Sequence, residues 1–471
     1  MDCVVSDTSL ARVPTPNGFP GASCHCQPVC RSISAKSTGL SLTSIDDPAA
    51  VKIWLAHVGE PLPIDAKNER QLRMSLIALS LAERGHEVTW WTSTFDHTHK
   101  RQRFAKHTRV EVAPNLVLQL LVARPYASNI SIDRLRNHRE AAAAFEEIAG
   151  EVTSADLPDV IFATMPTVEL AAAAANFGAK HGIPVIVDVR DLHPDIYLSL
   201  VPRIARGPAK IALNPLYRDL RTALKLATSI IAIAPSFLDW ALRHAGRSAR
   251  ASDRVFPLAY PELDVSEEAV LKGGQELDAM GVRSDRKIVW YVGTFNRWID
   301  LEAPIETARI LANSGNTDIQ FVLSGSGDFS DKWRKQAAGL PNVIFTGWID
   351  IPKLVHMRKI AWAGLAPYRA GFHTVGNKLF EYMAGGLPIL LSIDGDARTI
   401  MESHDAGLAY SGRDPQSLVK AVDIMLADGV RDRMSENSLN AFRNNYSAEK
   451  VYGEMIDFIL SAARQKSYAG S

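Results

Sequence analysis

Cysteine is scarce in this chain, and the few cysteines stand together near its start. All four of them, Cys3, Cys24, Cys26 and Cys30, fall within residues 1–50, and the rest of the chain has none. This absence excludes a structural disulfide in the main body and fits a reducing compartment. The cluster lacks paired C-x-x-C hooks, so we do not expect a zinc site. Residues 1–50 are rich in Ser, Pro, Thr and Gly without periodicity, and we expect a disordered tail there.

An excess of charge and long apolar runs are also missing. Lys plus Arg and Asp plus Glu number 52 each, and such a balance is not typical of a dedicated nucleic-acid binder. No run approaches the ~18 apolar residues of a membrane-spanning helix, and the N-terminus lacks an apolar signal core. We therefore expect a cytoplasmic protein that does not bind nucleic acid.

Strand and helix patterns alternate along the chain in two series. The apolar runs of the first series are residues 51–56, 87–92, 110–113, 116–122, 160–163, 185–188 and 230–234. The runs of the second series are residues 288–292, 319–323, 343–345, 363–366 and 389–391. Helical patterns lie between the runs. This alternation predicts an α/β protein with parallel sheets covered on both faces.

A break in the alternation suggests where two domains meet. It spans about residues 260–285 and carries Pro261 and the pair Gly273 and Gly274. We expect a Rossmann-like domain over residues 51–265, a linker over 266–285, and a second Rossmann-like domain over 286–445. A final helix and a tail occupy residues 446–471. Two such domains are expected to face a cleft, which is the natural ligand site.

The most informative local pattern is the stretch 371–388, which predicts a loop, a short helix and a buried strand. Free backbone N–H groups at the helix start, near Gly376 and Asn377, attract phosphate. Glu381 lies about one turn into the helix, where its carboxylate can accept hydrogen bonds from vicinal hydroxyls. Phosphate plus ribose indicates a nucleotide. An alternative stays open, in which Glu381 only complements the helix dipole.

Charged side chains also follow the predicted strand 185–188. Asp188, Arg190, Asp191 and His193 come at the carboxyl end of that strand, which is where α/β proteins place function. In the alternative, the two aspartates cap turns or pair with Arg190.

A further candidate follows the first strand of the second series. Gly293 there allows close approach of a phosphate, and Arg297 is placed to clamp its oxygens. Lys378 is a second candidate cation for the same phosphate. A solvated turn and a surface lysine are the alternatives.

The stretch 371–388 resembles the donor-binding motif of retaining, family-4-type glycosyltransferases with the GT-B fold. That family usually carries two glutamates eight positions apart here. The second is present as Glu381, and His373 stands at the first position. The resemblance extends over about residues 51–460. It implies that Glu381 binds the ribose of a nucleotide sugar, that position 373 contacts the transferred sugar, and that Gly59 lies near the donor phosphates.

The stretch 187–195 is similar to the D-x-R-D-x-W-P motif of bacterial sugar transferases that build surface polysaccharide, including the fucosamine-transferase-like group. His193 stands where that motif has Trp. The resemblance implies that Asp191 lies on the acceptor side of the cleft. There it acts as a general base or as an orienting group, and the sequence leaves both roles open.

The resemblance implies a transferase that moves a sugar from a nucleotide diphosphate, with UDP as the expected base, to an acceptor hydroxyl with retention. No D-x-D pair follows a strand at the expected donor site, so we expect neither a metal nor a cofactor. Two alternatives stay open. One is a nucleotide-sugar epimerase of the same fold, and the other is a non-catalytic partner subunit, which His373 favours.

A basic amphipathic stretch covers residues 202–226. Six Lys and Arg residues alternate there with apolar ones, a pattern typical of a helix on an anionic membrane. An ordinary helix with its apolar face in the core is the alternative. Many members of the resembled family use a polyprenyl-diphosphate-linked acceptor at the inner face of the plasma membrane, which favours peripheral membrane association.

Overall fold

Two β-sheets of mainly parallel strands form the framework of the protein. The computed structural model describes residues 50–65, 71–316, 318–369, 372 and 375–469. The predicted tail, with its four cysteines, and His373 lie outside the described residues. Residues from Ala50 onward form one compact unit.

The first sheet has eight strands in the order β10-β9-β8-β7-β1-β2-β6-β5, and only β5 runs antiparallel to its neighbour. The strands are β1 (Lys52–Ala56), β2 (Glu87–Ser93), β5 (Thr108–Ala113), β6 (Leu116–Leu121), β7 (Val160–Thr164), β8 (Val185–Val189), β9 (Ser229–Ala232) and β10 (Arg254–Val255). A small hairpin pairs β3 (Phe95–Asp96) with β4 (Arg101–Gln102). The chain direction across the sheet reverses between β1 and β7, so the loops after these strands diverge and leave a crevice.

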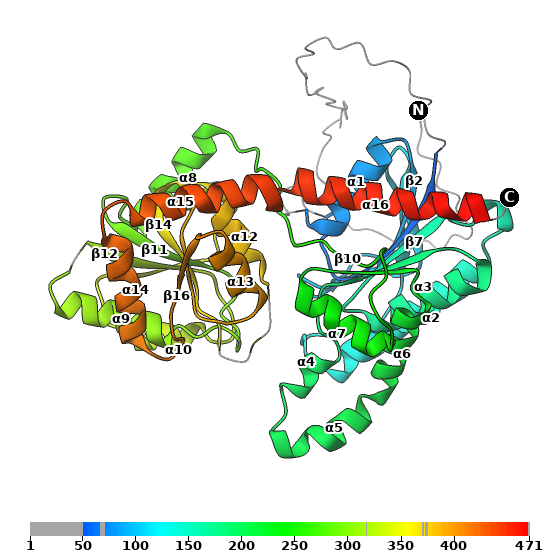
Figure 1. Ribbon diagram of the computed structural model, residues 1–471, viewed down its shortest axis with the longest axis horizontal. Helices are drawn as coiled ribbons and strands as arrows, with labels where there is room; N and C mark the ends of the chain where they lie inside the picture. Colours follow the sequence, from blue (N-terminus) through cyan, green and yellow to red (C-terminus); the bar gives the residue numbers. More distant parts are fainter. Residues whose placement is uncertain (1–49, 66–70, 317, 370–371, 373–374, 470–471) are drawn as a thin grey trace, which may run out of the picture. The chain divides into compact units, whose positions relative to one another are not determined.

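Helices cover both faces of the eight-stranded sheet (Figure 1). One face packs against α2 (Ile132–Gly150), α3 (Val168–His181), α6 (Asn214–Leu226) and α7 (Pro235–Ala245). The other face packs against α1 (Arg73–Glu83) and the last helix, α16 (Ala448–Ala469). Alternation along β1 sends Trp54 to the first face and Ile53 to the second.

The second sheet has six parallel strands in the order β13-β12-β11-β14-β15-β16. These are β11 (Lys287–Val292), β12 (Ile319–Ser324), β13 (Val343–Gly347), β14 (Ala361–Ala366), β15 (Ile389–Leu391) and β16 (Gly407–Ala409). The helices around it are α8 (Glu267–Ala279), α9 (Glu302–Asn313), α10 (Ser330–Gln336), α11 (Ile351–Ile360), α12 (Asn377–Ala384), α13 (Asp396–Ser403), α14 (Pro415–Leu426) and α15 (Val430–Ala441). Here the direction reverses between β11 and β14, which places a second crevice at their carboxyl ends.

The predicted fold class is confirmed, and every strand predicted from the sequence is present with its ends within two residues of the expected positions. The strands that the pattern missed are β3, β4, β10 and β16. Each has only two or three residues, too few for an alternating or apolar run to stand out.

The segment expected as a linker, residues 266–285, contains the 13-residue helix α8. The pair Gly273 and Gly274 suggested a flexible break, but its role is close packing. A Cβ on Gly273 would lie 3.1 Å from the backbone nitrogen of Lys353, and one on Gly274 would lie 2.4 Å from the His356 ring. The two glycines therefore let α8 approach α11 closely.

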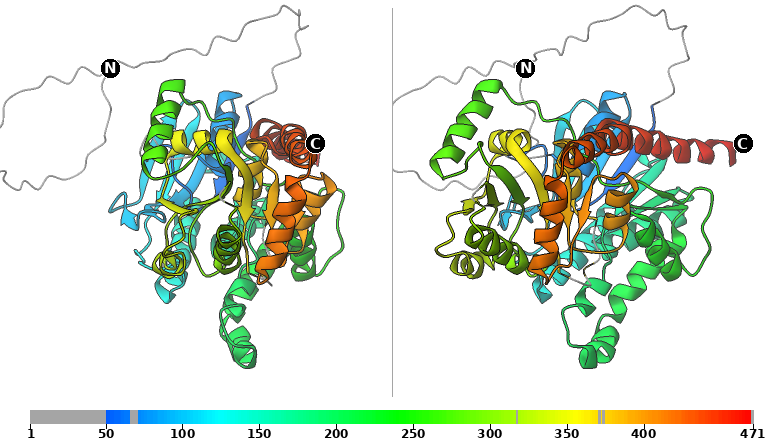
Figure 2. Two further views of the ribbon diagram at one scale, coloured as in Figure 1. Left: turned by 90° about the vertical axis from the view of Figure 1, so that its left-hand side faces the viewer. Right: turned by 60° about the vertical axis from the view of Figure 1, so that its left-hand side comes forward.

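The basic stretch 202–226 divides into two parts. Arg203–Ala205 form a 3₁₀ turn that leads into α5 (Arg206–Ala212), and neither element has a buried residue. The following helix α6 buries five side chains: Leu216, Tyr217, Leu220, Ala223 and Leu224. Figures 1 and 2 show α5 at the end of a segment that extends away from the eight-stranded sheet. The core-helix alternative thus describes α6, and the exposed basic interpretation applies to α5.

Among the residues that the structure describes, no helix combines the length and the apolar character that crossing a bilayer requires.

Candidate functional site

A cavity of about 290 Å³ opens at the carboxyl ends of β1, β7 and β8. Three residues predicted from the sequence line it: Gly59 after β1, Asp191 after β8 and Asn377 at the start of α12. Further lining residues with polar side chains are His57, Glu60, Ser93, His97, Tyr126, Arg134, Asn137, His138, Thr167 and Arg190. Gly59 has φ of +105°, a conformation that glycine adopts without strain.

A buried ion pair between Glu60 and Arg190 forms one wall of this cavity. Burial alone would raise the pKa of Glu60, but the charge of Arg190 and the hydrogen bonds from Arg190 and from the Met74 backbone hold it below its usual value. Burial also lowers the pKa of His57 to about 4, so this histidine is neutral at pH 7. The wall therefore carries balanced charge. Asp188, near the end of β8, is also buried. Its carboxylate oxygen Oδ2 lies 3.4 Å from Nε of Arg73.

Asp191 also lines a second cavity, of about 480 Å³. Its carboxylate oxygen Oδ1 accepts a hydrogen bond from the Leu192 backbone at 2.9 Å, as the turn-capping alternative predicted. Burial raises the pKa of Asp191 above its usual value. An accessible carboxylate that holds a proton more tightly than usual is suited to accept one from a hydroxyl group.

Arg297 lines the second cavity as well, so the structure brings it and Asp191 to one hollow. The Arg297 guanidinium is exposed and lies 5.5 Å from the centre of the Trp298 ring. Trp298 stacks on Phe372 with ring centres 4.6 Å apart. The loop after β11 thus offers an aromatic platform and a cation to this cavity.

Lys378 and Gly293 lie together at the reversal point between β11 and β14. The Lys378 ammonium is 3.2 Å from the Tyr368 hydroxyl and 5.2 Å from the centre of the Tyr291 ring. Burial lowers the pKa of Lys378 to about 7. Gly293 has φ of +143°, and a Cβ there would lie 3.5 Å from the Lys378 nitrogen. A larger side chain at position 293 would therefore contact this cation.

A neighbouring turn, Ser324 to Asp328, keeps the Gly293 loop in place. A Cβ on Gly325 would come within 1.8 Å of the Gly293 carbonyl oxygen. The backbone of Gly293 donates to the Ser324 carbonyl at 3.0 Å. Close packing of two loops is thus a sufficient reason for glycine at position 325.

Glu381 is buried and forms an ion pair with Arg358, whose Nε lies 2.5 Å from the carboxylate oxygen Oε1. It lies outside the linings of the two cavities described above. On the same helix, Gly376 precedes the first turn in an extended conformation, and Asn377 is exposed at its start. Asn377 therefore lies at the crevice of the first sheet and Lys378 at the crevice of the second. Glu381, on the same helix, pairs with Arg358 instead.

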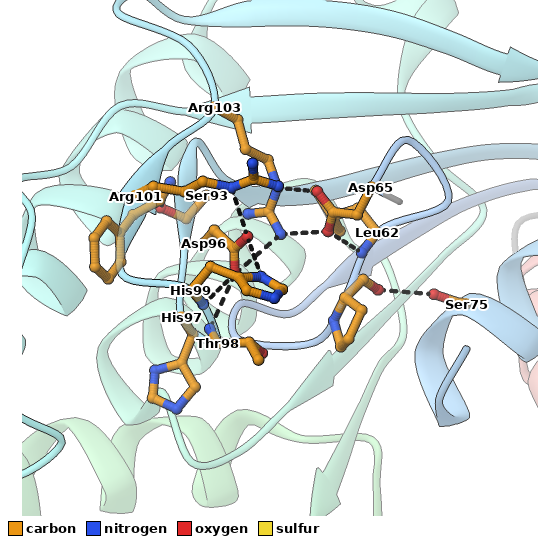
Figure 3. A network of polar contacts seen from close by, with 12 residues as sticks. Leu62, Asp65, Ser75, Ser93, Asp96, His97, Thr98, His99, Arg101 and Arg103 are labelled. Atoms are coloured by element: carbon orange, nitrogen blue, oxygen red, sulfur yellow. Dashed lines mark hydrogen bonds and ion pairs between the residues drawn. The ribbon is translucent and has the colours of Figure 1, made fainter. Parts of the chain in front are cut away.

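Sequence analysis missed several residues of the first cavity, among them Arg134, His138 and His97. The first two stand on α2, a helix in which no local pattern marks a binding residue. His97 stands in the β3–β4 hairpin, which Asp96 braces by accepting the backbone N–H groups of residues 98 and 99, each at 3.0 Å (Figure 3). Nearby, Arg103 donates to both carboxylate oxygens of Asp65, at 2.7 and 2.5 Å. No local sequence signal marks such a hairpin as part of a binding site.

The part of the chain that the structure describes contains no group of three or more His, Cys, Asp and Glu side chains placed to hold a metal ion.

Part of the chain is similar to a known protein family. Residues 286–428, which hold Gly293, Arg297, Lys378 and Glu381, match the family described as glycosyl transferases group 1. A curated relative, an uncharacterised glycosyltransferase of Methanocaldococcus jannaschii, is 25% identical over 183 residues. That match covers 38% of this chain and 46% of the relative, so the chain spans about half the length of that protein.

Similar solved structures cover nearly the whole chain. Sucrose-phosphate synthase from Thermosynechococcus elongatus has 18% identity and a TM-score of 0.63, over 89% of this chain and 100% of that one. Trehalose 6-phosphate synthase from Burkholderia multivorans has 13% identity and a TM-score of 0.61, over 90% and 100%. HepE from Anabaena in complex with UDP-glucose has 16% identity and a TM-score of 0.56, over 88% and 100%. The chain therefore contains a glycosyl transferase group 1 domain and has the GT-B fold.

Proposed function

We propose that the protein is a glycosyltransferase that moves a sugar from a nucleotide-diphosphate donor, a UDP-sugar, to an acceptor hydroxyl. The observation that carries the proposal is the Lys378 ammonium beside Gly293 at the reversal point of the second sheet. This pair lies within the segment that matches the glycosyl transferase family. HepE, which shares the fold, was solved with UDP-glucose bound.

The leaving diphosphate gains negative charge as the glycosidic bond to it breaks. A cation already held next to an open glycine stabilises that charge without reorganising when the bond breaks. In this proposal Lys378 contacts the diphosphate, Arg297 adds a second cation, and Gly376 and Asn377 offer backbone N–H groups at the start of α12. Glu381 binds the ribose. No metal is required, since these groups supply the charge.

The acceptor hydroxyl approaches from the side of Asp191, whose raised pKa suits it to orient the hydroxyl or to accept its proton. We propose that the sugar is transferred with retention of its anomeric configuration and that the sugar is a hexose or an N-acetylhexosamine. The acceptor we propose is polyprenyl-diphosphate-linked, in the assembly of a bacterial surface polysaccharide. The enzyme then works at the inner face of the plasma membrane, and the exposed α5 segment supports this placement.

Incubation with a panel of nucleotide sugars tests the proposal. Release of UDP from one donor, dependent on an acceptor glycan lipid, is the expected result, with the anomeric configuration of the product measured by NMR. An epimerised donor without transfer would identify a nucleotide-sugar epimerase. Failure of UDP and every nucleotide sugar to bind would contradict the proposal outright.

A further inference from the structure

Arg134 stands at the junction of the two cavities. It lines both of them, and Asp191 is the other residue that the two linings share. Its guanidinium is held from two directions: Nε donates to His138 Nε2 at 3.4 Å and Nη1 donates to the Asn129 carbonyl at 2.7 Å. Both partners are uncharged acceptors, so they orient the guanidinium and leave its charge unbalanced.

Of the three other arginines that line these cavities, two are neutralised and Arg297 is exposed. Arg190 pairs with Glu60, and Arg369 lies 3.7 Å from Asp300. Arg134 forms no ion pair with any carboxylate of the described residues. It also occupies the first turn of α2, where the helix dipole disfavours a cation. The fold thus holds the Arg134 guanidinium with hydrogen bonds but without a compensating charge, as an anion-binding site requires.

The histidines and Tyr197 that face Arg134 are neutral at pH 7, and Asp191, Glu169 and Lys100 also interact with its charge. Burial lowers the pKa of His97 and of His193 to about 3. It lowers the pKa of His138 as well and raises the pKa of Tyr197 to about 12. Among these neighbours, Asp191 is the acidic residue that lines both cavities. One of its carboxylate oxygens already accepts a hydrogen bond from a backbone N–H group. The region around Arg134 thus has positive potential inside a partly desolvated hollow, where charge is weakly screened.

Apolar side chains form the adjoining wall of the second cavity. Ile130, Ile196 and Leu200 line it, and Ile130 is 53% exposed. A ligand that fits this wall combines an anionic group with an apolar chain.

We infer that Arg134 binds an anionic group of the acceptor, a phosphate or a carboxylate, next to the hydroxyl that Asp191 orients. This inference rests on the proposed function for the word acceptor, and it names the residue that binds the anionic part of that substrate. His138 is a positioning residue, because it contacts Arg134. Behind it, Glu169 in the first turn of α3 lies 3.8 Å from His138 Nδ1.

The test uses three probes that differ in one group: hexyl phosphate, hexyl glucuronide and hexyl glucoside. Each is titrated by calorimetry into the full-length protein saturated with UDP, so that the donor phosphate site is filled. We expect either anionic probe to bind at least about tenfold more tightly than the neutral glucoside, because a hydrogen bond to a charged group is involved. The tighter of the two anions then distinguishes a phosphate from a carboxylate acceptor.

Two variants on α2 provide the matched comparison. Arg134→Gln should abolish the preference for the anionic probes and leave UDP affinity unchanged. Arg136→Gln, on the same helix, should keep the preference, because Arg136 is exposed and pairs with Asp133 at 3.3 Å. Equal binding of charged and neutral probes by the wild-type protein overturns the inference without any variant. A preference that survives in Arg134→Gln overturns it too. If UDP does not bind, the proposed function fails, and the same titration without UDP still decides whether Arg134 forms an anion site.

Discussion

Arg358 and Glu381 form a buried ion pair, with Nε of Arg358 2.5 Å from the carboxylate. The proposed ribose ligand thus already has a charged partner within the protein. Removing the carboxylate would leave the partly buried Arg358 without its partner, and such a loss costs up to about 3–5 kcal/mol when the charge is fully buried. A role in nucleotide binding and a role in stability must therefore be measured separately.

Glu381→Gln keeps the shape and removes the charge. We expect it to weaken UDP binding at least about tenfold, because charge-assisted hydrogen bonds to the ribose are lost. The effect should vanish with 2′,3′-dideoxyuridine diphosphate, which lacks both hydroxyls. Calorimetric Kd values give the binding effect, and thermal melting gives the stability effect. A lowered Tm with unchanged UDP affinity would leave Glu381 a purely structural partner of Arg358.

Lys378 should make donor binding depend on pH. Its pKa of about 7 means that the free protein loses the ammonium charge as the pH rises above 7. A bound diphosphate favours the charged form, so binding at pH 8 to 9 should take up a proton. UDP affinity should therefore fall between pH 7 and pH 9. The phosphate itself is already ionised in this range, because its second pKa is about 6.

Calorimetry in two buffers of different ionisation enthalpy measures that proton uptake. Lys378→Arg provides the control, because arginine stays charged throughout this range. Its UDP affinity should be flat with pH. Equal pH profiles for both proteins would show that Lys378 does not contact the diphosphate.

Glu381 and Lys378 show how far the site could be predicted from the sequence. The spacing of residues 371–388 predicted a helix that carries both and a strand after it, and the structure has α12 and β15 there. The partners could not be predicted, because they arise from strand order. Tyr291 lies near the end of β11 and Tyr368 follows β14, and these strands become neighbours only in the sheet. Arg358 likewise stands on another helix, α11.

Arg134 and the pair Gly273 and Gly274 show the other limit. A lysine or arginine on a polar helix is ordinary. Arg134 differs from such residues only because it has no carboxylate partner among the described residues. Two adjacent glycines are typical of linkers, and only the closeness of α11 explains them in a helix. Patterns with a period of two or 3.6 residues predict elements, whereas pairings across elements depend on the tertiary structure.

Asp191→Asn should reduce turnover and leave donor affinity unchanged. Asparagine keeps the oxygen that accepts the Leu192 hydrogen bond, so the loop should hold its conformation. We expect kcat to fall about a hundredfold or more, as for a lost general base. Steady-state kinetics with the identified donor, together with UDP titration, separates the two parameters. Near-normal kcat would reduce Asp191 to the cap of a turn.

Arg297→Gln should slow transfer more than it weakens binding of the bare nucleoside. The guanidinium is exposed over Trp298, so its removal leaves no buried group unpaired and should not change Tm. A charge that acts on the leaving diphosphate affects the transition state most. Comparison of kcat with the uridine Kd tests this, and unchanged kcat would place the phosphate site elsewhere.

Helix α5 and the turn before it should bind anionic membrane. Ile204 and Ile211 are 93% and 77% exposed, and the three cations of the segment are exposed beside them: Arg203, Arg206 and Lys210. Each cation near an anionic surface adds about 1 kcal/mol, and added salt screens that attraction. Cosedimentation with phosphatidylserine vesicles should therefore be strong at low salt and weak at high salt.

Separate variants distinguish the two contributions to this binding. Replacing the three cations with Gln should remove the salt-dependent part, and Ile204→Ser with Ile211→Ser should weaken binding at every salt concentration, because buried apolar area is lost. Arg218→Gln with Lys225→Gln removes two exposed charges from α6 and serves as the control, since α6 packs on the core. We expect little change there. Because α5 buries no side chain, all variants should keep the wild-type Tm. If the wild-type protein ignores vesicles at all salt concentrations, α5 has another role and a soluble acceptor is favoured.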